Sequence, residues 1–189
     1  RFYWSGGIKL IFYIILSIVI VQRLLELVIA KRNEKNMRAK GAYEVGASHY
    51  PLMILLHVSF FVSLLIEVST FNLTPSPLFL LFFVMFLCVQ GLRVWCLTSL
   101  GSFWNTKIII LPGVNVVSKG PYKYLRHPNY LVVSIEIALL PLMFQAYFTA
   151  ICFTILNALM LCIRIPTEER ALKKATNYEQ YMQHKNTVN

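Results

Sequence analysis

Long apolar segments follow one another along this chain, separated by shorter polar stretches. A helix needs ~20 apolar residues to cross the roughly 30 Å hydrocarbon core of a bilayer. Three segments have this length, and the last apolar block suits two shorter spans with Pro141 helping to break the helix between them. The pattern predicts an all-α integral membrane protein with about five transmembrane helices, at residues 8–30, 51–70, 78–100, 129–143 and 147–165.

Composition supports this class, because 57% of the residues are hydrophobic and only 14% are charged. Soluble domains are less apolar and carry more charge. The sequence contains no internal repeat and no low-complexity tract, so residues 1–189 are expected to form a single membrane domain.

Basic residues alternate with the predicted spans, which gives an independent test of the topology. Loops on the cytoplasmic side carry an excess of Lys and Arg. The connections at residues 71–77 and 143–148 carry no charge, whereas the basic residues follow the first span, precede the fourth and follow the last. They are Lys31, Arg32, Lys35, Arg38, Lys40, Lys107, Lys119, Lys123, Arg126, Arg170, Lys173, Lys174 and Lys185. Five spans with the N-terminus outside and the C-terminus cytoplasmic fit this alternation. The net charge of +10 then reflects contact with anionic lipid headgroups and not with nucleic acid.

Several polar side chains fall within the predicted spans, where each is costly and therefore a functional candidate. They are Arg23, Glu26, His57, Glu67, Gln90, Arg93, Glu136, Asn157 and Arg164. Arg23 and Glu26 are three residues apart and are expected to pair on one helical face. His57 and Glu136 lie deeper in their spans. Each could form a hydrogen bond to a neighbouring helix or have a functional role. The cysteines form no C-x-x-C pair, so neither a disulfide framework nor a metal site is predicted.

Two polar clusters flank the last pair of spans. Residues 118–130 have the pattern of a loop that leads into a helix, with Pro128 at the first helical position beside Arg126 and His127. The free amides of such a helix start suit a carboxylate or a phosphate. In the second cluster, at residues 164–170, Pro166 is expected to kink or restart the helix.

If that helix continues, Arg164 and Glu168 share one face. If it restarts, Glu168 and Glu169 instead complement the positive end of a new amphipathic helix at about residues 168–182. Both clusters end on the predicted cytoplasmic boundary. The C-terminal half is therefore expected to form a pocket at the cytoplasmic face.

These segments resemble the isoprenylcysteine carboxyl methyltransferase family. The family carries a Gly-x-Tyr-x-x-x-Arg-His-Pro-x-Tyr-like segment, here residues 120–130, and an Arg-x-Pro-x-Glu-Glu-like segment, here residues 164–169. A weaker match lies at residues 100–104, and the resemblance covers about residues 95–185, the expected catalytic region. The first half looks more like a bacterial branch associated with O-methylation of long-chain polyketides such as alkylpyrones. This resemblance implies a location in a bacterial plasma membrane.

The resemblance implies S-adenosylmethionine as methyl donor, bound without a Rossmann fold, and the chain has no G-x-G. From their positions in the motifs, the resemblance implies that the cofactor-binding residues are Gly120, Tyr122, His127, Pro128, Tyr130 and Glu169. It implies that the catalytic residues are Arg164 and Glu168. Glu169 would hold the cofactor's ammonium group. The acceptor is a lipophilic molecule that enters from the bilayer, either an isoprenylcysteine-type carboxylate or an alkylpyrone or phenolic hydroxyl. A phenol would need a base, for which Glu168 and His127 are the candidates.

Two other classes of protein remain possible from the sequence. A small transporter or channel subunit could use Glu136, His57 and Arg93 within the membrane. A scaffold could use the amphipathic helix at residues 168–182 to bind a partner or the membrane surface. Neither predicts saturable binding of S-adenosylmethionine.

Overall fold

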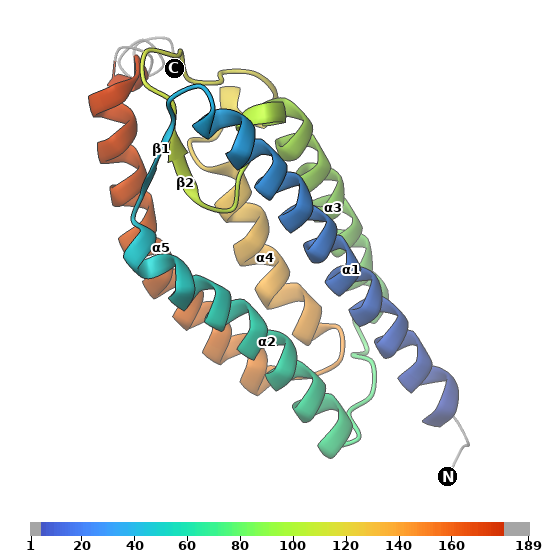
Figure 1. Cartoon of the computed structure of the whole chain (residues 1–189). Coiled ribbons are helices and arrows are strands. Elements are labelled where there is room, and N and C mark those ends of the chain that lie inside the picture. Colours follow the sequence, from blue (N-terminus) through green and yellow to red (C-terminus); the bar gives the residue numbers. More distant parts are fainter. Residues whose placement is uncertain (1–4, 180–189) are drawn as a thin grey trace.

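The computed structural model describes residues 5–179, which form an elongated bundle of five helices (Figure 1). The helices are α1 (Ser5–Arg38), α2 (Tyr50–Thr70), α3 (Phe79–Leu100), α4 (Pro128–Leu142) and α5 (Tyr147–Ala175). Four of them, all but α4, are long and apolar enough to cross a membrane. The predicted all-α membrane class is confirmed, and the protein is a multi-pass membrane protein. A helix lies at each of the five predicted spans, but the fourth, α4, is shorter than a membrane span.

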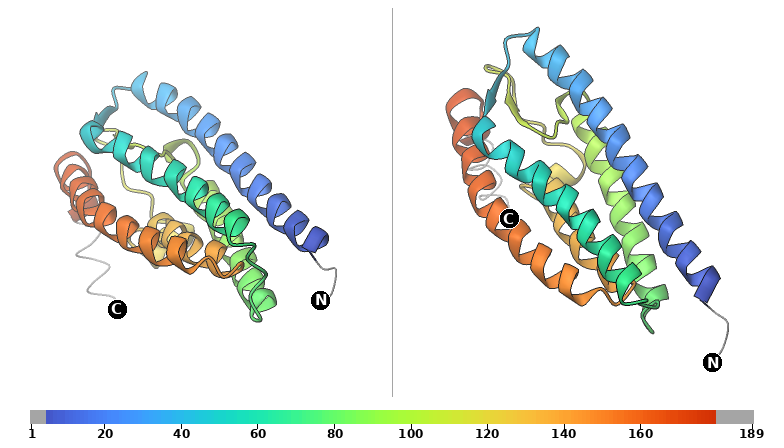
Figure 2. Two further views of the ribbon diagram at one scale, coloured as in Figure 1. Left: turned by 90° about the horizontal axis from the view of Figure 1, so that it is seen from below. Right: turned by 60° about the horizontal axis from the view of Figure 1, so that its bottom comes forward.

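Helix α4 is short because it lies inside the bundle and not at its lipid-facing surface. It packs between α3 and α5 (Figure 2). All of its side chains except that of Leu131 are buried or half-buried. Val132, Ile137, Leu139 and Leu140 are at most 5% exposed. By contrast, the outer faces of the other four helices carry exposed Leu, Ile, Val and Phe side chains, as expected for contact with lipid.

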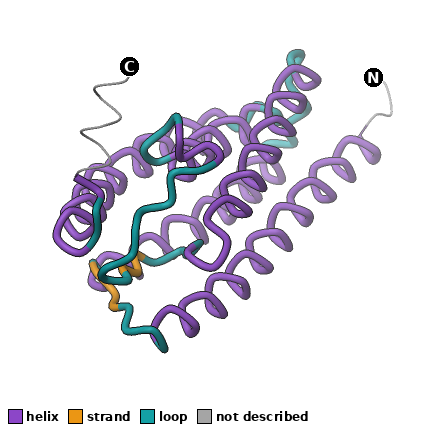
Figure 3. The backbone as a smooth tube through the Cα atoms, turned by 90° about the horizontal axis from the view of Figure 1, so that it is seen from above, coloured by secondary structure: helices purple, strands orange, loops and turns teal. Residues whose placement is uncertain are grey.

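Two short strands join the connections at one end of the bundle, and neither was predicted. Strand β1 (Tyr43–Val45) pairs antiparallel with β2 (Ile108–Ile110), with Tyr43 opposite Ile110. Viewed from above, the loops gather over this end of the bundle beside the strands (Figure 3). Short 3₁₀ helices flank them at Ala47–His49, Gly101–Phe103 and Gly120–Lys123. We call this end of the bundle the strand end.

Helix α5 runs without interruption through Pro166, so the predicted restart of the helix is wrong. Proline removes one backbone hydrogen bond from a helix but does not by itself end it where tertiary contacts hold both sides. Here Arg164, before the proline, and Glu168, after it, both bond to Tyr130 of α4. The predicted separate amphipathic helix is therefore the last part of α5 as far as Ala175. Its expected end at residues 180–182 lies outside the described residues.

Four charged side chains pair inside the bundle and join three helices. The expected pair of Arg23 and Glu26 is confirmed at 2.8 Å, and Arg23 also reaches Glu136 of α4 at 2.5 Å. Arg93 of α3 bonds to Glu26 at 2.7 Å and, through its Nε, to Glu136 at 2.9 Å. Two guanidinium groups therefore neutralise two carboxylates. We call these four residues the buried charge cluster.

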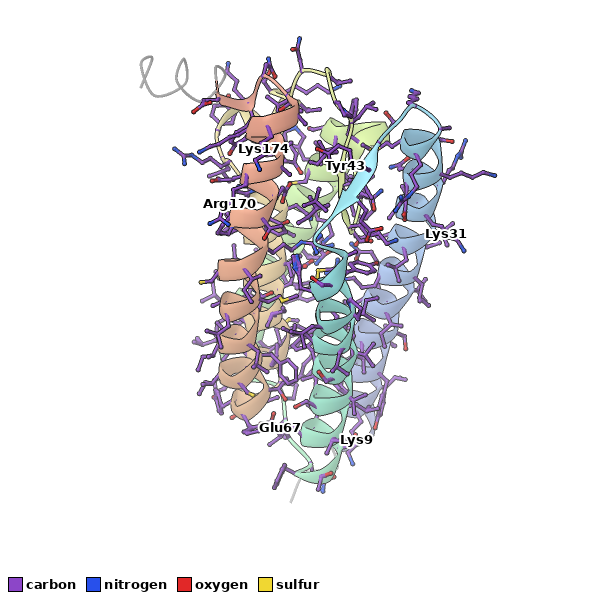
Figure 4. The ribbon with its side chains drawn as sticks, turned by 60° about the vertical axis from the view of Figure 1, so that its left-hand side comes forward. Lys9, Lys31, Tyr43, Glu67, Arg170 and Lys174 are labelled. Atoms are coloured by element: carbon purple, nitrogen blue, oxygen red, sulfur yellow. The ribbon has the colours of Figure 1, made fainter. Side chains whose placement is uncertain are left out.

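Glu67 caps a neighbouring helix. Its carboxylate accepts hydrogen bonds from the backbone amides of Phe148 and Thr149 at 3.1 and 2.8 Å, at the start of α5. These amides have no partner within their own helix. The side chain therefore has a structural role at the end of the bundle opposite the strands, where Figure 4 places it.

Candidate functional site

A cavity of about 490 Å³ lies inside the strand end of the bundle. This volume is within the usual range for a small-molecule site. Both polar clusters contribute to its wall. The polar lining residues from these clusters and the following loop are Tyr122, Arg126, His127, Asn129, Tyr130, Arg164, Glu168 and Tyr178. The structure thus brings five of the eight predicted site residues to one cavity.

Gly120 and Pro128 are not lining residues but shape the backbone of the first motif. Pro128 starts α4, as expected from its fixed φ. Gly120 has a φ of +59°, and a Cβ atom there would lie 2.0 Å from Oγ of Ser99 and 3.0 Å from Nε1 of Trp95. Only glycine allows this segment to approach α3 so closely.

Gly120→Ala is therefore expected to lower the free energy of unfolding by about 2–4 kcal/mol, since the left-handed backbone and the contact with Ser99 both add cost. Thermal unfolding in detergent would measure it. Gly113→Ala is the matched control, because Gly113 has a φ of +74° and a Cβ atom there would meet nothing within 4 Å, so it carries the backbone cost alone. Equal losses in the two variants would contradict the packing role of Gly120.

Tyr130 connects the two motifs. Its hydroxyl donates to Oε2 of Glu168 at 2.5 Å and accepts from Nε of Arg164 at 2.9 Å. The Arg164 guanidinium also lies over the Tyr130 ring, 5.8 Å from its centroid, and donates to the backbone carbonyl of Thr106. Arg164 is only 5% exposed, so these contacts fix its charge inside the cavity wall. Because α5 is continuous, Arg164 and Glu168 do share one face.

His127 stacks on Tyr130 with ring centroids 5.4 Å apart. Its Nε2 lies 3.0 Å from Oε1 of Glu169, and its Nδ1 lies 4.0 Å from Oε2 of Glu168. Tyr178 donates to the same Glu169 oxygen at 3.2 Å, and burial together with the Glu169 charge raises the pKa of Tyr178 to about 12. Glu169 itself is not a lining residue, and the contacts that it makes orient His127 and Tyr178.

Two buried polar atoms lie at the cavity: Oδ1 of Asn129, which has no partner among the described residues, and the hydroxyl of Tyr122, which adjoins only the weakly hydrogen-bonding thiol of Cys96. Burial raises the pKa of Tyr122 well above its usual range, so the hydroxyl stays protonated and can donate. A buried polar atom without a partner costs free energy unless a ligand or water satisfies it. These two atoms indicate where a polar ligand would bind.

The sequence reasoning missed Asn129, Tyr178 and Thr106 as parts of the site. Asn129 occupies the variable position of the first motif, and its only local signal is a polar side chain beside Pro128 at a helix start. Tyr178 follows the second cluster by eight residues and Thr106 precedes the first, and only the fold shows that both reach the cavity.

An apolar wall formed by α1 and α2 completes the cavity. Leu24 and Leu27 of α1 and Ile54 and Val58 of α2 line it, and their side chains are 45–57% exposed. The cavity therefore has a polar part and an apolar part.

Comparison with known proteins identifies the family. The sequence profile of the isoprenylcysteine carboxyl methyltransferase (ICMT) family matches residues 79–174, slightly more than half of the chain. The chain belongs to this family. The match includes both motifs and all of the site residues predicted from them, and the ICMT family is one of membrane methyltransferases.

Two similar bacterial proteins extend the resemblance beyond the matched region. The uncharacterized protein YpbQ of Bacillus subtilis is 48% identical over 86% of this chain and 97% of its own length. An uncharacterized protein of Haemophilus influenzae is 31% identical over 82% of this chain and 90% of its own length. No solved structure matches the chain. The names of these proteins do not state a branch of the family, so the alkylpyrone branch stays a prediction.

Proposed function

We propose that this protein is an S-adenosylmethionine-dependent O-methyltransferase that acts on a lipophilic acceptor within the membrane. The observation that carries the proposal is the two-sided cavity. It combines the buried polar atoms of Tyr122 and Asn129 with an apolar wall of α1 and α2 side chains. A polar methyl donor could bind in the polar part of such a cavity and a lipophilic acceptor in the apolar part.

The residues of the polar part fit the methyl donor. When bound, S-adenosylmethionine supplies an electrophilic methyl group on a sulfonium. Tyr122 and Asn129 offer a donor and an acceptor to its polar atoms, and the Tyr130–His127 stack offers an aromatic surface. The carboxylate of Glu168 in the cavity wall favours its ammonium group, and Glu169, behind the wall, adds negative charge there through its contact with His127. Gly120 and Pro128 hold the backbone in shape.

Methyl transfer to oxygen is an in-line displacement in which the protein mainly aligns the reacting atoms and excludes water. Arg164 provides a fixed positive charge for the acceptor oxygen, since Tyr130 and Thr106 hold its guanidinium. Glu168 orients Tyr130 and so keeps Arg164 in place. We assign Arg164 and Glu168 to the point where donor and acceptor meet.

The acceptor enters from the bilayer between α1 and α2 with its tail in lipid. Its polar group is an isoprenylcysteine-type carboxylate or, as the resemblance of the first half to the bacterial branch suggests, the hydroxyl of a long-chain alkylpyrone or phenolic polyketide. The cavity faces the cytoplasm of a bacterial cell, with the N-terminus outside. The position of Lys31, Arg170 and Lys174 at the strand end supports this orientation (Figure 4).

The buried charge cluster argues against a transporter or channel. Both carboxylates of the cluster are paired with Arg23 or Arg93, and these contacts link α1, α3 and α4. Charges held in this way serve packing and do not mark a path through the membrane.

Calorimetric titration of S-adenosylhomocysteine into detergent-purified protein tests the proposal. Wild type is expected to bind saturably. His127→Ala and Glu169→Ala are expected to weaken binding about tenfold or more, because each removes one partner of the 3.0 Å charge-assisted contact. His49→Ala is the matched control, since His49 does not line the cavity, and it should bind like wild type. Folded wild type that binds no S-adenosylhomocysteine would overturn the proposal and favour the transporter.

A further inference from the structure

His57 lies in the wall of the cavity, on the same helix as the apolar lining residues Ile54 and Val58. It is half-buried and lines both the main cavity and a second, smaller void. The function proposed above makes no use of it. An ionisable side chain at such a depth is costly to retain without a role.

The hydrogen bond of His57 decides which ring nitrogen carries the proton. Nδ1 lies 2.8 Å from the backbone carbonyl of Met53, one turn earlier in α2. A carbonyl oxygen can only accept, so Nδ1 is the donor and Nε2 of the neutral ring carries a lone pair. No other described residue makes a hydrogen bond to Nε2. His57 therefore presents a fixed proton acceptor within the cavity wall.

The two bases expected from the sequence are already engaged. Nε2 of His127 contacts Glu169 at 3.0 Å, and its Nδ1 faces Glu168 at 4.0 Å. Glu168 in turn accepts the proton of the Tyr130 hydroxyl at 2.5 Å. Both side chains thus have structural partners that a catalytic proton transfer would disturb, whereas His57 can accept a proton at Nε2 and keep its hydrogen bond from Nδ1 to Met53.

We propose that His57 is the general base of the methyl transfer and that the acceptor is a lipophilic phenol or enol that is protonated at neutral pH. This inference rests on the proposed function. A carboxylate acceptor is already ionised and needs only the counter-charge of Arg164. A hydroxyl acceptor must lose a proton, and a base positioned for it contributes ~10²–10⁴-fold.

In this step the acceptor O–H bond breaks and its proton passes to Nε2 of His57. The oxygen electron pair forms the new O–CH₃ bond, and the methyl–sulfur bond breaks with its electron pair left on sulfur, which becomes a neutral thioether. The positive charge of the sulfonium is thereby replaced by that of the imidazolium, which then releases its proton to water.

Charged groups on the other four helices face this region. They are Arg23 and Glu26 on α1, Arg93 on α3, Glu136 on α4, and Arg164 and Glu168 on α5, where Glu168 is engaged with Tyr130. The first four form the buried charge cluster and neutralise one another. Arg164 has no carboxylate partner among the described residues and remains to stabilise the phenolate that His57 generates.

His57→Asn tests the base, because an asparagine amide can still donate to Met53 but cannot accept the proton. With a long-chain alkylphenol, kcat is expected to fall ~10²–10⁴-fold with little change in KM. With a long-chain 4-hydroxy-2-pyrone, which is ionised at neutral pH, kcat should change only a few-fold. His49→Asn is the control and should match wild type on both acceptors. Added imidazole should restore part of the alkylphenol rate in His57→Ala.

A binding measurement without turnover provides a second readout. A long-chain 4-nitrophenol bound in the presence of S-adenosylhomocysteine should show its phenolate absorption at lower pH in wild type than in His57→Asn. Equal rate losses on both acceptors, or no loss on the phenol together with an unchanged nitrophenol titration, would overturn the role of His57. Wild type that fails to bind S-adenosylhomocysteine would instead overturn the proposed function, and this inference with it.

Discussion

Arg164→Ala is expected to lower kcat for methyl transfer by ~10²–10³-fold while weakening S-adenosylhomocysteine binding by less than about tenfold. A fixed positive group aimed at a reacting oxygen has an effect of this size in other enzymes. The guanidinium is buried and is held by Tyr130 and by the carbonyl of Thr106, so nothing else can take its place after truncation. Steady-state kinetics with either acceptor, beside calorimetry on the same preparation, would measure both quantities.

Two further variants separate charge from geometry at this position. Arg164→Lys keeps the positive charge but cannot make both hydrogen bonds at once, so an intermediate rate is expected. Arg170→Ala removes an exposed arginine from the same helix and should leave kcat unchanged. A fully active Arg164→Ala enzyme would remove Arg164 from the catalytic assignment, and a parallel loss of binding and turnover would make it a cofactor-binding residue.

The helices were predictable because their apolar lengths follow directly from the sequence. The expected spans at residues 51–70 and 78–100 differ by one residue at most from α2 (Tyr50–Thr70) and α3 (Phe79–Leu100). Helix α1 extends beyond its expected end at residue 30 to Arg38. Its polar last turns are held by tertiary contacts, since the Asn33 side chain donates to the carbonyls of Gly101 and Trp104 at 3.0 and 2.8 Å. Hydropathy cannot detect such contacts.

The remaining differences also arise from interactions between distant segments. The path of α5 through Pro166 depends on Tyr130, which bonds to side chains on both sides of the proline. Strands β1 and β2 are three residues each and pair across more than sixty positions of sequence, so neither has a strong local signal. The motifs predicted five residues that line the cavity, but they also assigned Glu169 to the lining, whereas it contacts His127 and Tyr178 from outside.

Glu136→Ala is expected to lower the free energy of unfolding by about 3–5 kcal/mol, because it leaves buried guanidinium groups without their full complement of carboxylates. Glu136 is 5% exposed and is shared by Arg23 and Arg93. Unfolding by heat or denaturing detergent would measure the loss. Glu44→Ala is the control. Glu44 pairs with Arg38 and Lys107 outside the bundle core, where such pairs contribute at most about 1 kcal/mol.

A double variant tests whether the cluster acts through charge balance. In Arg93→Leu with Glu136→Leu, one positive and one negative group are removed together, and Arg23 keeps its 2.8 Å contact with Glu26. Replacement of a buried ion pair by apolar side chains is often neutral, so the double variant should be more stable than either single variant. If the double variant were instead as unstable as the sum of the two single variants, the geometry of the cluster and not its neutrality would hold α1 against α3 and α4.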